Sequence, residues 1–186
     1  MYYHCSSVSG LTQLQPRKPQ HFDKDALVYM TTSLPMAPMY GIRNFEYTYG
    51  YTKGGQIYYE EYFPDALRIL YSGKPASLYE CAPQDVTHTQ IPNEVVSALP
   101  VNVLREIRIP DVLQALLEQE RQGTLVIRRY EQLSPKDREW ILRAETREIV
   151  KRGLLRTPSP MADYMKLHYP AVWEAAVLKE NETPED

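Results

Sequence analysis

Short apolar segments, interrupted by proline and glycine, dominate the first 110 residues. Apolar, aromatic and β-branched side chains gather or alternate within them, a pattern typical of strands. Four segments predict strands: 1–5, 26–32, 77–81 and 95–109. Between them, residues 59–71 predict a short helix with Leu67 and Leu70 facing inward. This part of the chain is therefore expected to form a β-rich unit.

Helical spacing of apolar residues replaces this pattern after Pro110. Asp111 suits the cap of a helix that runs to Gln122, and Gly123 ends it. Ser134 and Pro135 begin a second helix in the same way. The remaining predicted elements are a strand over 124–129, the end of the second helix before 153, and a last helix from 158 or 161 towards 179 that is kinked at 170.

Together these elements predict an α+β protein with two regions. Residues 1–110 are expected to form a compact mixed β core, and residues 111–186 a mainly helical subdomain packed on it. A chain of 186 residues is long enough to bury a sizeable core of this kind. The isolated polar residues lie in the first region, so chemistry is expected there.

Charge and composition narrow the range of functions. The net charge of −3 lacks the clustered basic surface typical of nucleic-acid binding. Neither a membrane-spanning apolar run nor a leader peptide is recognisable, so we expect a cytoplasmic protein with no membrane partner. Cys5 and Cys81 are then expected to be free thiols. The histidines lack the paired spacing of a metal site, and Gly54-Gly55 lacks the lysine of a phosphate-binding loop.

Tyrosine is unusually frequent, with 15 residues against 3 Phe and 2 Trp. Seven tyrosines fall between positions 40 and 62. Because tyrosine combines an apolar ring with a polar tip, it suits half-buried and contact surfaces. Residues 40–62 therefore allow a non-catalytic alternative, a binding module with a tyrosine-rich surface for a protein partner.

Three residues stand out by their order and setting. His4 lies in the first predicted strand, Tyr29 in the second, and Glu94 opens a later β segment. Taken singly, each is more often a structural residue than a site residue. Their shared order resembles the ADP-ribosyltransferase fold, in the branch whose motifs are His, Tyr and Glu. The segments that carry the resemblance are Tyr3-His4-Cys5-Ser6-Ser7 with Gly10-Leu11 and Leu14-Gln15-Pro16, Val28-Tyr29-Met30-Thr31-Thr32 with Ala37, and Glu94-Val95-Val96 with Pro100-Val101-Asn102-Val103.

The resemblance covers about the first 110 residues and implies an NAD-dependent mono-ADP-ribosyltransferase. Such an enzyme cleaves the nicotinamide–ribose bond of NAD and transfers ADP-ribose to an acceptor. By similarity, Glu94 would stabilise the cationic transition state at the ribose. His4 would hold the other ribose by its hydroxyl, and Tyr29 would stack on the nicotinamide ring.

Further contacts with NAD are implied in the same way. The backbone of Cys5 would hold the carboxamide, and Ser6 and Thr31 would lie near the dinucleotide. A basic residue is needed for the phosphates, and the candidates are Arg17, Lys18 and Arg43, of which Arg43 is counted with the binding residues.

Two departures from the family pattern limit what is implied. Glycine is common after the histidine, where this chain has Cys5, whose Cβ would lie close to the nicotinamide ring. Members that modify arginine usually carry Glu or Gln two residues before the catalytic Glu, where this chain has Pro92. The acceptor is therefore left open between a small molecule, another protein side chain, a nucleic acid and water.

Two further alternatives remain open. Glu80 and Glu106 compete with Glu94 for the catalytic role, since both lie in or beside predicted strands. An RNA 2'-phosphotransferase shares the fold, but it has a second histidine where this chain has Tyr29, and the acidic charge balance disfavours RNA.

Overall fold

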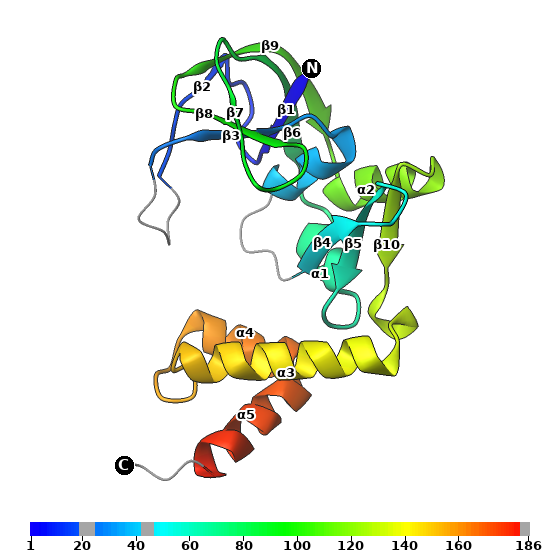
Figure 1. Ribbon diagram of the computed structural model, residues 1–186, viewed down its shortest axis with the longest axis vertical. Helices are drawn as coiled ribbons and strands as arrows, with labels where there is room; N and C mark the ends of the chain where they lie inside the picture. The colour runs from blue at the N-terminus through cyan, green and yellow to red at the C-terminus, as the bar shows by residue number, and fades with distance from the viewer. Residues whose placement is uncertain (19–24, 42–46, 183–186) are drawn as a thin grey trace. The chain divides into compact units, whose positions relative to one another are not determined.

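The computed structural model describes residues 1–18, 25–41 and 47–182 (Figure 1). Contacts divide the chain into two compact units. The first consists of Met1–Phe45, Tyr49–Tyr59 and Leu67–Ile127, and the second of Glu46–Thr48, Glu60–Ala66 and Arg128–Asp186. The change of pattern after Pro110 does not coincide with this division, because the helix that follows it belongs to the first unit.

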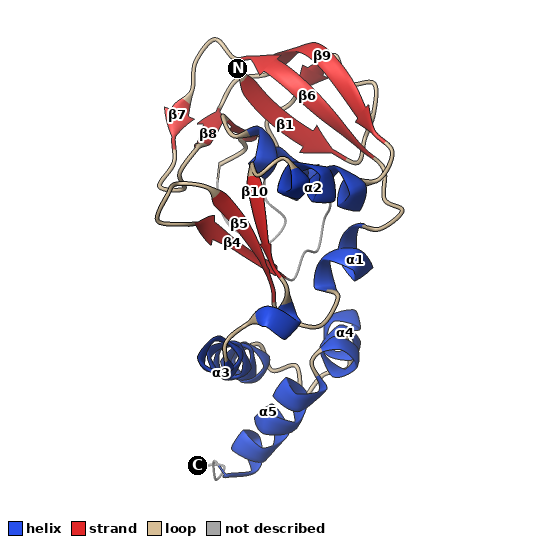
Figure 2. Ribbon diagram, turned by 90° about the vertical axis from the view of Figure 1, so that its right-hand side faces the viewer, coloured by secondary structure: helices blue, strands red, loops and turns tan. Residues whose placement is uncertain are grey.

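A seven-stranded antiparallel sheet forms the first unit, in the order β2-β9-β6-β1-β3-β8-β7. Figure 2 shows β1, β6 and β9 of this sheet side by side. The strands are β1 (Tyr2–Ser6), β2 (Gln13–Leu14), β3 (Val28–Thr31), β6 (Ala76–Ala82), β7 (Thr87–His88), β8 (Glu94–Ser97) and β9 (Val101–Ile109). Each of the four predicted strand segments overlaps one or two of them, with boundaries that differ by a few residues, and the predicted α+β class is confirmed.

β1 is paired unequally on its two sides. All five of its residues are in register with β6, whereas its register with β3 is the single pair Tyr3–Thr31. β1 and β3 are thus paired at one position and do not form a continuous ladder. This places the residues after Tyr3 beside the start of β3 without a continuous backbone ladder.

The two faces of the sheet are covered differently. Alternate side chains point to opposite faces, and one face carries an apolar cluster made of Leu14, Val28, Met30, Tyr79, Cys81, Val95 and Val101. A 3-10 helix, η1 (Leu34–Gly41), contacts β1, β3 and β6, and α2 (Val112–Arg121) contacts η1. Cys5 and Cys81 are both buried and free; Cys81 is opposite Tyr2, three residues from Cys5, so the two thiols project to opposite faces.

The predicted helix over 59–71 is wrong in its first part. Ile57, Tyr59 and Glu61 are buried while the residues between them are half-buried, so the segment alternates as the strand β5 (Ile57–Glu61). Pro64 and Asp65, with φ of 60° at Asp65, separate it from α1 (Ala66–Tyr71). Leu67 and Leu70 are buried as predicted. β5 lies between β4 (Tyr47–Tyr51) and β10 (Leu125–Arg128) in a second sheet.

Helices make up most of the second unit. They are η2 (Tyr130–Gln132), α3 (Pro135–Lys151), α4 (Pro160–His168) and α5 (Pro170–Glu182).

The predicted caps are confirmed in both units, since the side chain of Asp111 accepts a hydrogen bond from the Gln114 amide and that of Ser134 accepts one from the Asp137 amide. The single kinked helix predicted after 158 is instead two helices, because Tyr169 leaves the helical conformation before Pro170.

One apolar core holds these helices together. Its buried members are Tyr62, Phe63, Ala66, Leu133, Ile141, Ile149, Met165, Tyr169, Val172 and Ala176. No helix in the described part of the chain is both long enough and apolar enough to cross a membrane.

Candidate functional site

A cavity of about 450 Å³ opens in the first unit beside the single joint between β1 and β3. Its volume is within the usual range for small-molecule sites. It takes side chains from β1, β2, β3, η1 and the loops between them. The described residues that line it are His4, Cys5, Ser6, Ser7, Val8, Leu11, Gln13, Leu14, Gln15, Arg17, Lys18, Leu27, Val28, Tyr29, Tyr40 and Gly41.

His4 bridges the two strands where their backbones separate. Its Nδ1 lies 2.8 Å from the carbonyl oxygen of Tyr29. Because a carbonyl only accepts, Nδ1 carries the proton, which leaves Nε2 of the neutral ring as an acceptor. Burial lowers the pKa of His4; the hydrogen bond to Tyr29 opposes this and the charge of Arg17 adds to it. The imidazole is thus held neutral with one acceptor nitrogen.

Cys5 is fully buried, and its thiol packs against Gly41 at the end of η1. A Cβ on Gly41 would lie 2.6 Å from the Cys5 sulfur, closer than two such atoms approach. Burial also raises the pKa of Cys5 to about 12, so the thiol stays protonated and is a poor nucleophile. The side chain therefore fills space within the cavity wall, opposite a glycine that makes room for it.

Glu94 is buried at the start of β8, with 6% of its surface exposed. The Tyr40 hydroxyl donates to its Oε2 over 2.7 Å, and the Thr89 hydroxyl donates to its Oε1 over 2.9 Å. Burial, together with this carboxylate, raises the pKa of Tyr40 well above its usual value. Glu94 is not among the described residues that line the cavity, but Tyr40 is, so the carboxylate lies one hydrogen bond behind the wall.

The competing carboxylates are engaged elsewhere. Glu80 lies 3.9 Å from Arg105. Glu106 accepts from the Ser77 hydroxyl at 2.6 Å and pairs with Arg108 at 2.8 Å. The bond from Ser77 is the main reason that the pKa of Glu106 is lowered. Among these three carboxylates, Glu94 is the one that bonds to a described residue of the cavity wall.

The other residues that the sequence predicts as NAD contacts differ in whether they line the cavity. Ser6 and Tyr29 line the cavity. Thr31 is fully buried opposite Glu94 in the β3–β8 ladder, where its hydroxyl accepts from the Ser33 amide, and it is not among the described lining residues. Arg43, the third candidate for the phosphates, lies outside the described residues.

Arg17 and Lys18 give the cavity a positive side. Two backbone hydrogen bonds between Arg17 and Leu27, of 3.1 and 3.2 Å, fix the chain at this point. Both basic residues line the cavity, and none of its described lining residues is acidic. This charge suits an anionic ligand, and hydroxyl, amide and imidazole groups beside it supply neutral hydrogen bonds.

Tyr40 is the site residue that sequence reasoning missed. It is one of the seven tyrosines assigned to a contact surface, with nothing in the sequence to separate it from the others. Several of these hydroxyls point inward: Tyr51 donates to the Pro92 carbonyl and Tyr59 to the Pro35 carbonyl. Every tyrosine of this stretch whose side chain is described is buried or half-buried, and Tyr40 is the one among them that lines the cavity.

No protein-family model matches the chain, and no curated protein matches it in sequence. Among the described residues, His, Cys, Asp and Glu form no group of three that could hold a metal ion.

Proposed function

We propose that the cavity binds NAD and that the chain is a mono-ADP-ribosyltransferase. One observation carries this proposal: His4, Cys5, Ser6 and Tyr29, which were singled out for this chemistry by sequence, line one cavity. Tyr40, on the same wall, donates a hydrogen bond to Glu94, which the sequence singled out as the catalytic residue. Apart from Tyr40, these residues belong to three neighbouring strands of the sheet, β1, β3 and β8.

The cavity offers a suitable group for each part of the dinucleotide. The Nε2 of His4 accepts from a ribose hydroxyl. Tyr29 and Tyr40 supply rings for the nicotinamide. The diphosphate binds Arg17 and Lys18, whose charges face no described acidic side chain of the wall. The backbone of Cys5 lies beyond the single β1–β3 pair and binds the carboxamide.

The reaction breaks the bond between the nicotinamide nitrogen and C1' of the ribose. The bonding electrons leave with neutral nicotinamide, and positive charge develops at the ribose. An acceptor then attacks C1' and loses its proton. A carboxylate near that centre stabilises the transition state, and Glu94 is the buried carboxylate nearest the wall by hydrogen bonding. Glu94 reaches the ribose once its bond to Tyr40 opens.

Nicotinamide release from NAD by the full chain tests this proposal. Glu94→Gln keeps the size of the side chain and removes its charge, so we expect turnover to fall at least about a thousandfold. Dinucleotide binding, measured by calorimetry, should persist. Glu80→Gln is the matched control, because its carboxylate pairs with Arg105 and should leave release within about twofold of wild type.

The possible results separate cleanly. Release that disappears in Glu94→Gln and persists in Glu80→Gln supports the assignment. Full activity in Glu94→Gln removes Glu94 from the reaction. If the wild-type chain neither binds NAD nor releases nicotinamide, the cavity is not an NAD site. If nicotinamide is released, the acceptor is sought by adding small molecules, proteins and nucleic acids to the active enzyme.

A further inference from the structure

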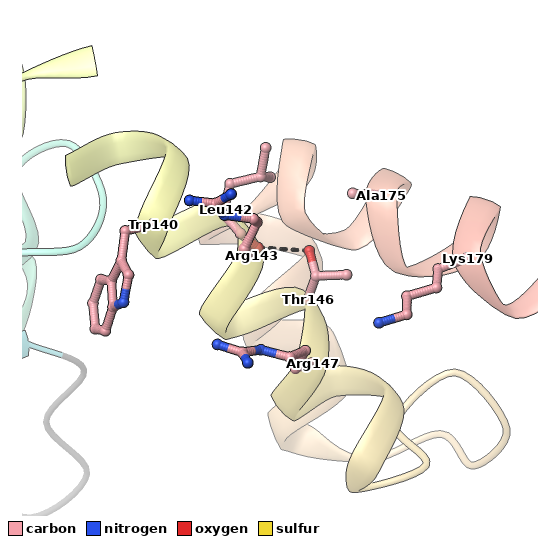
Figure 3. A pocket seen from close by; sticks show the side chains of 7 residues that line it. All are labelled: Trp140, Leu142, Arg143, Thr146, Arg147, Ala175 and Lys179. Carbon is pink, nitrogen blue, oxygen red and sulfur yellow. Dashed lines mark hydrogen bonds between the residues drawn. The ribbon is translucent and has the colours of Figure 1, made fainter. Parts of the chain in front are cut away.

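The second unit contains a groove of its own between α3 and α5, with a volume of about 540 Å³ (Figure 3). Figure 3 shows Thr146 of α3 facing Lys179 of α5, with Trp140 towards the beginning of α3. The described residues that line the groove are Trp140, Leu142, Arg143, Thr146, Arg147, Ala175 and Lys179.

Positive charge is concentrated on this groove. Three of its described lining residues, Arg143, Arg147 and Lys179, are basic, and none is acidic. Glu139 offsets part of the charge of Arg143 at a distance of 3.3 Å. Basic side chains thus outnumber acidic ones among the described lining residues, in a chain whose net charge is −3.

The sequence of α3 places Arg147 in an unfavourable row. The residues one turn before and after it, at i−4 and i+4, are Arg143 and Lys151. Like charges at this spacing destabilise a helix by a few tenths of a kcal/mol per pair. Four acidic residues elsewhere on α3 show that neutralising partners were available to the helix. Arg143 and Lys151 each pair with a glutamate of the helix, Glu139 at 3.3 Å and Glu148 at 3.9 Å. Arg147 is thus the member of the row to which the described residues give no such pair.

Trp140 adds a flat aromatic surface beside these charges. Nearly half of its surface, 49%, is exposed, which is uncommon for a large apolar side chain. Tyr62 contacts the indole edge-on, with ring centroids 5.9 Å apart and planes at 73°, and so holds its orientation. The indole is thus fixed on one side and open on the other.

The floor of the groove adds no competing polar group. Its residues are Leu142, Thr146 and Ala175, and the Thr146 hydroxyl donates to the Leu142 carbonyl over 2.6 Å. A ligand therefore contacts cations, an exposed aromatic face and an apolar floor. A nucleobase joined to a phosphate matches this set, because the base stacks on an aromatic ring and the phosphate pairs with Arg and Lys.

We propose that the groove between α3 and α5 binds a phosphorylated nucleoside, with the base on Trp140 and the phosphate on Arg147. The ligand is either a free nucleotide or a segment of single-stranded nucleic acid, which share this chemistry. All the residues concerned belong to the second unit. The inference is therefore independent of the NAD cavity in the first unit.

Tryptophan fluorescence gives a direct test, because the chain has only two tryptophans. In a Trp173→Phe background, Trp140 is the single reporter. Uridine 5'-monophosphate, which contains neither adenine nor nicotinamide, should quench it saturably. Uridine without phosphate and inorganic phosphate without a base should each bind at least about tenfold more weakly. A short oligouridylate is titrated in parallel. Tighter binding of the oligouridylate than of the mononucleotide identifies single-stranded nucleic acid as the ligand, and tighter binding of the mononucleotide identifies a free nucleotide.

Two alanine variants provide the matched comparison. Arg147→Ala should weaken binding of uridine 5'-monophosphate about tenfold or more. Arg152→Ala removes an exposed arginine of the same helix end that pairs with Glu148, so it should change affinity less than about twofold. Alanine favours helix at both positions, so folding is kept. Tyr29→Ala should leave this binding unchanged, which excludes the first-unit cavity as the site.

The proposal is overturned if neither the mononucleotide nor the oligouridylate changes Trp140 fluorescence. Equal losses of affinity in Arg147→Ala and Arg152→Ala also overturn it, since they would indicate unspecific attraction to positive charge. The thermal midpoint of each variant is recorded as well. We expect Arg147→Ala to be at least as stable as Arg152→Ala, because it relieves a like-charge row.

Discussion

Gly41 ends η1 directly against the thiol of Cys5, at a distance that leaves no room for a side chain at position 41. The two residues are 36 positions apart in the sequence. The Cys5 thiol occupies the space that a side chain at position 41 would need, and the glycine at 41 leaves that space to the thiol. Position 41 therefore requires glycine as long as the Cys5 thiol fills this space.

Gly41→Ala should destabilise the first unit. The added methyl group would meet the Cys5 sulfur at 2.6 Å and the Ala76 Cβ at 3.3 Å. Overpacking of this kind costs about 1–3 kcal/mol. Urea unfolding of the variant and of wild type measures the difference.

Cys5→Ala combined with Gly41→Ala provides the control. It removes the sulfur that the added methyl group would contact, so the double variant should lose less stability than the sum of the two single variants. Strict additivity would show that the two positions do not interact.

Tyr40→Phe should destabilise the protein through Glu94. The buried carboxylate would lose a donor at 2.7 Å and keep the one from Thr89. Loss of a hydrogen bond to a charged group costs about 1.5–3 kcal/mol. Tyr130→Phe, in the second unit, removes a hydroxyl that does not contact Glu94, and its urea midpoint should stay close to that of wild type.

Stability should fall as the pH drops below about 6.5, in part because of His4. Its pKa is lowered in the folded state from a usual 6.5, so the unfolded chain binds the proton more readily. Stability therefore rises with pH through the interval between the folded pKa and 6.5, is fully present above it, and is lost below. His4→Gln should show a flatter pH dependence of the unfolding free energy. A parallel profile for the variant and wild type would contradict this.

Tyr29→Ala should weaken NAD binding about tenfold or more if the ring stacks on the nicotinamide, since stacking contributes about 1–3 kcal/mol per base. Calorimetry with NAD measures the affinity. Tyr29→Phe keeps the ring and should bind within about threefold of wild type. Equal affinity in Tyr29→Ala and wild type would remove the stacking role.

Local signals predict the elements that depend on local chemistry. Asp111 and Ser134 are recognisable as caps because their side chains satisfy amides three residues ahead. The sequence favours a helix for residues 59–61 because Leu67 and Leu70 extend a helical pattern backwards. The burial of Tyr59 and Glu61 on one side of a strand depends on the sheet that β5 joins, which the local sequence does not reveal.

The site is predictable to the extent that it is built on strand order. His4, Cys5, Ser6 and Tyr29 belong to short segments that are uninformative singly and stand out by their shared order along the chain. Tyr40 could not be identified, because its role arises from a contact with Glu94, which is 54 residues away. The sequence alone does not separate Arg17 and Lys18 from Arg43 as phosphate candidates; the Arg17–Leu27 bridge and the cavity lining place the first two on the wall.

β1 precedes every other strand along this chain, yet it lies in the interior of the sheet, between β6 and β3. During synthesis it must wait for both neighbours, and β6 is complete only at Ala82. Pairing across such sequence separations closes long loops, which slows folding. The cavity beside β1 is consequently a late product of folding, and it cannot form in a nascent chain until most of the first unit has emerged from the ribosome.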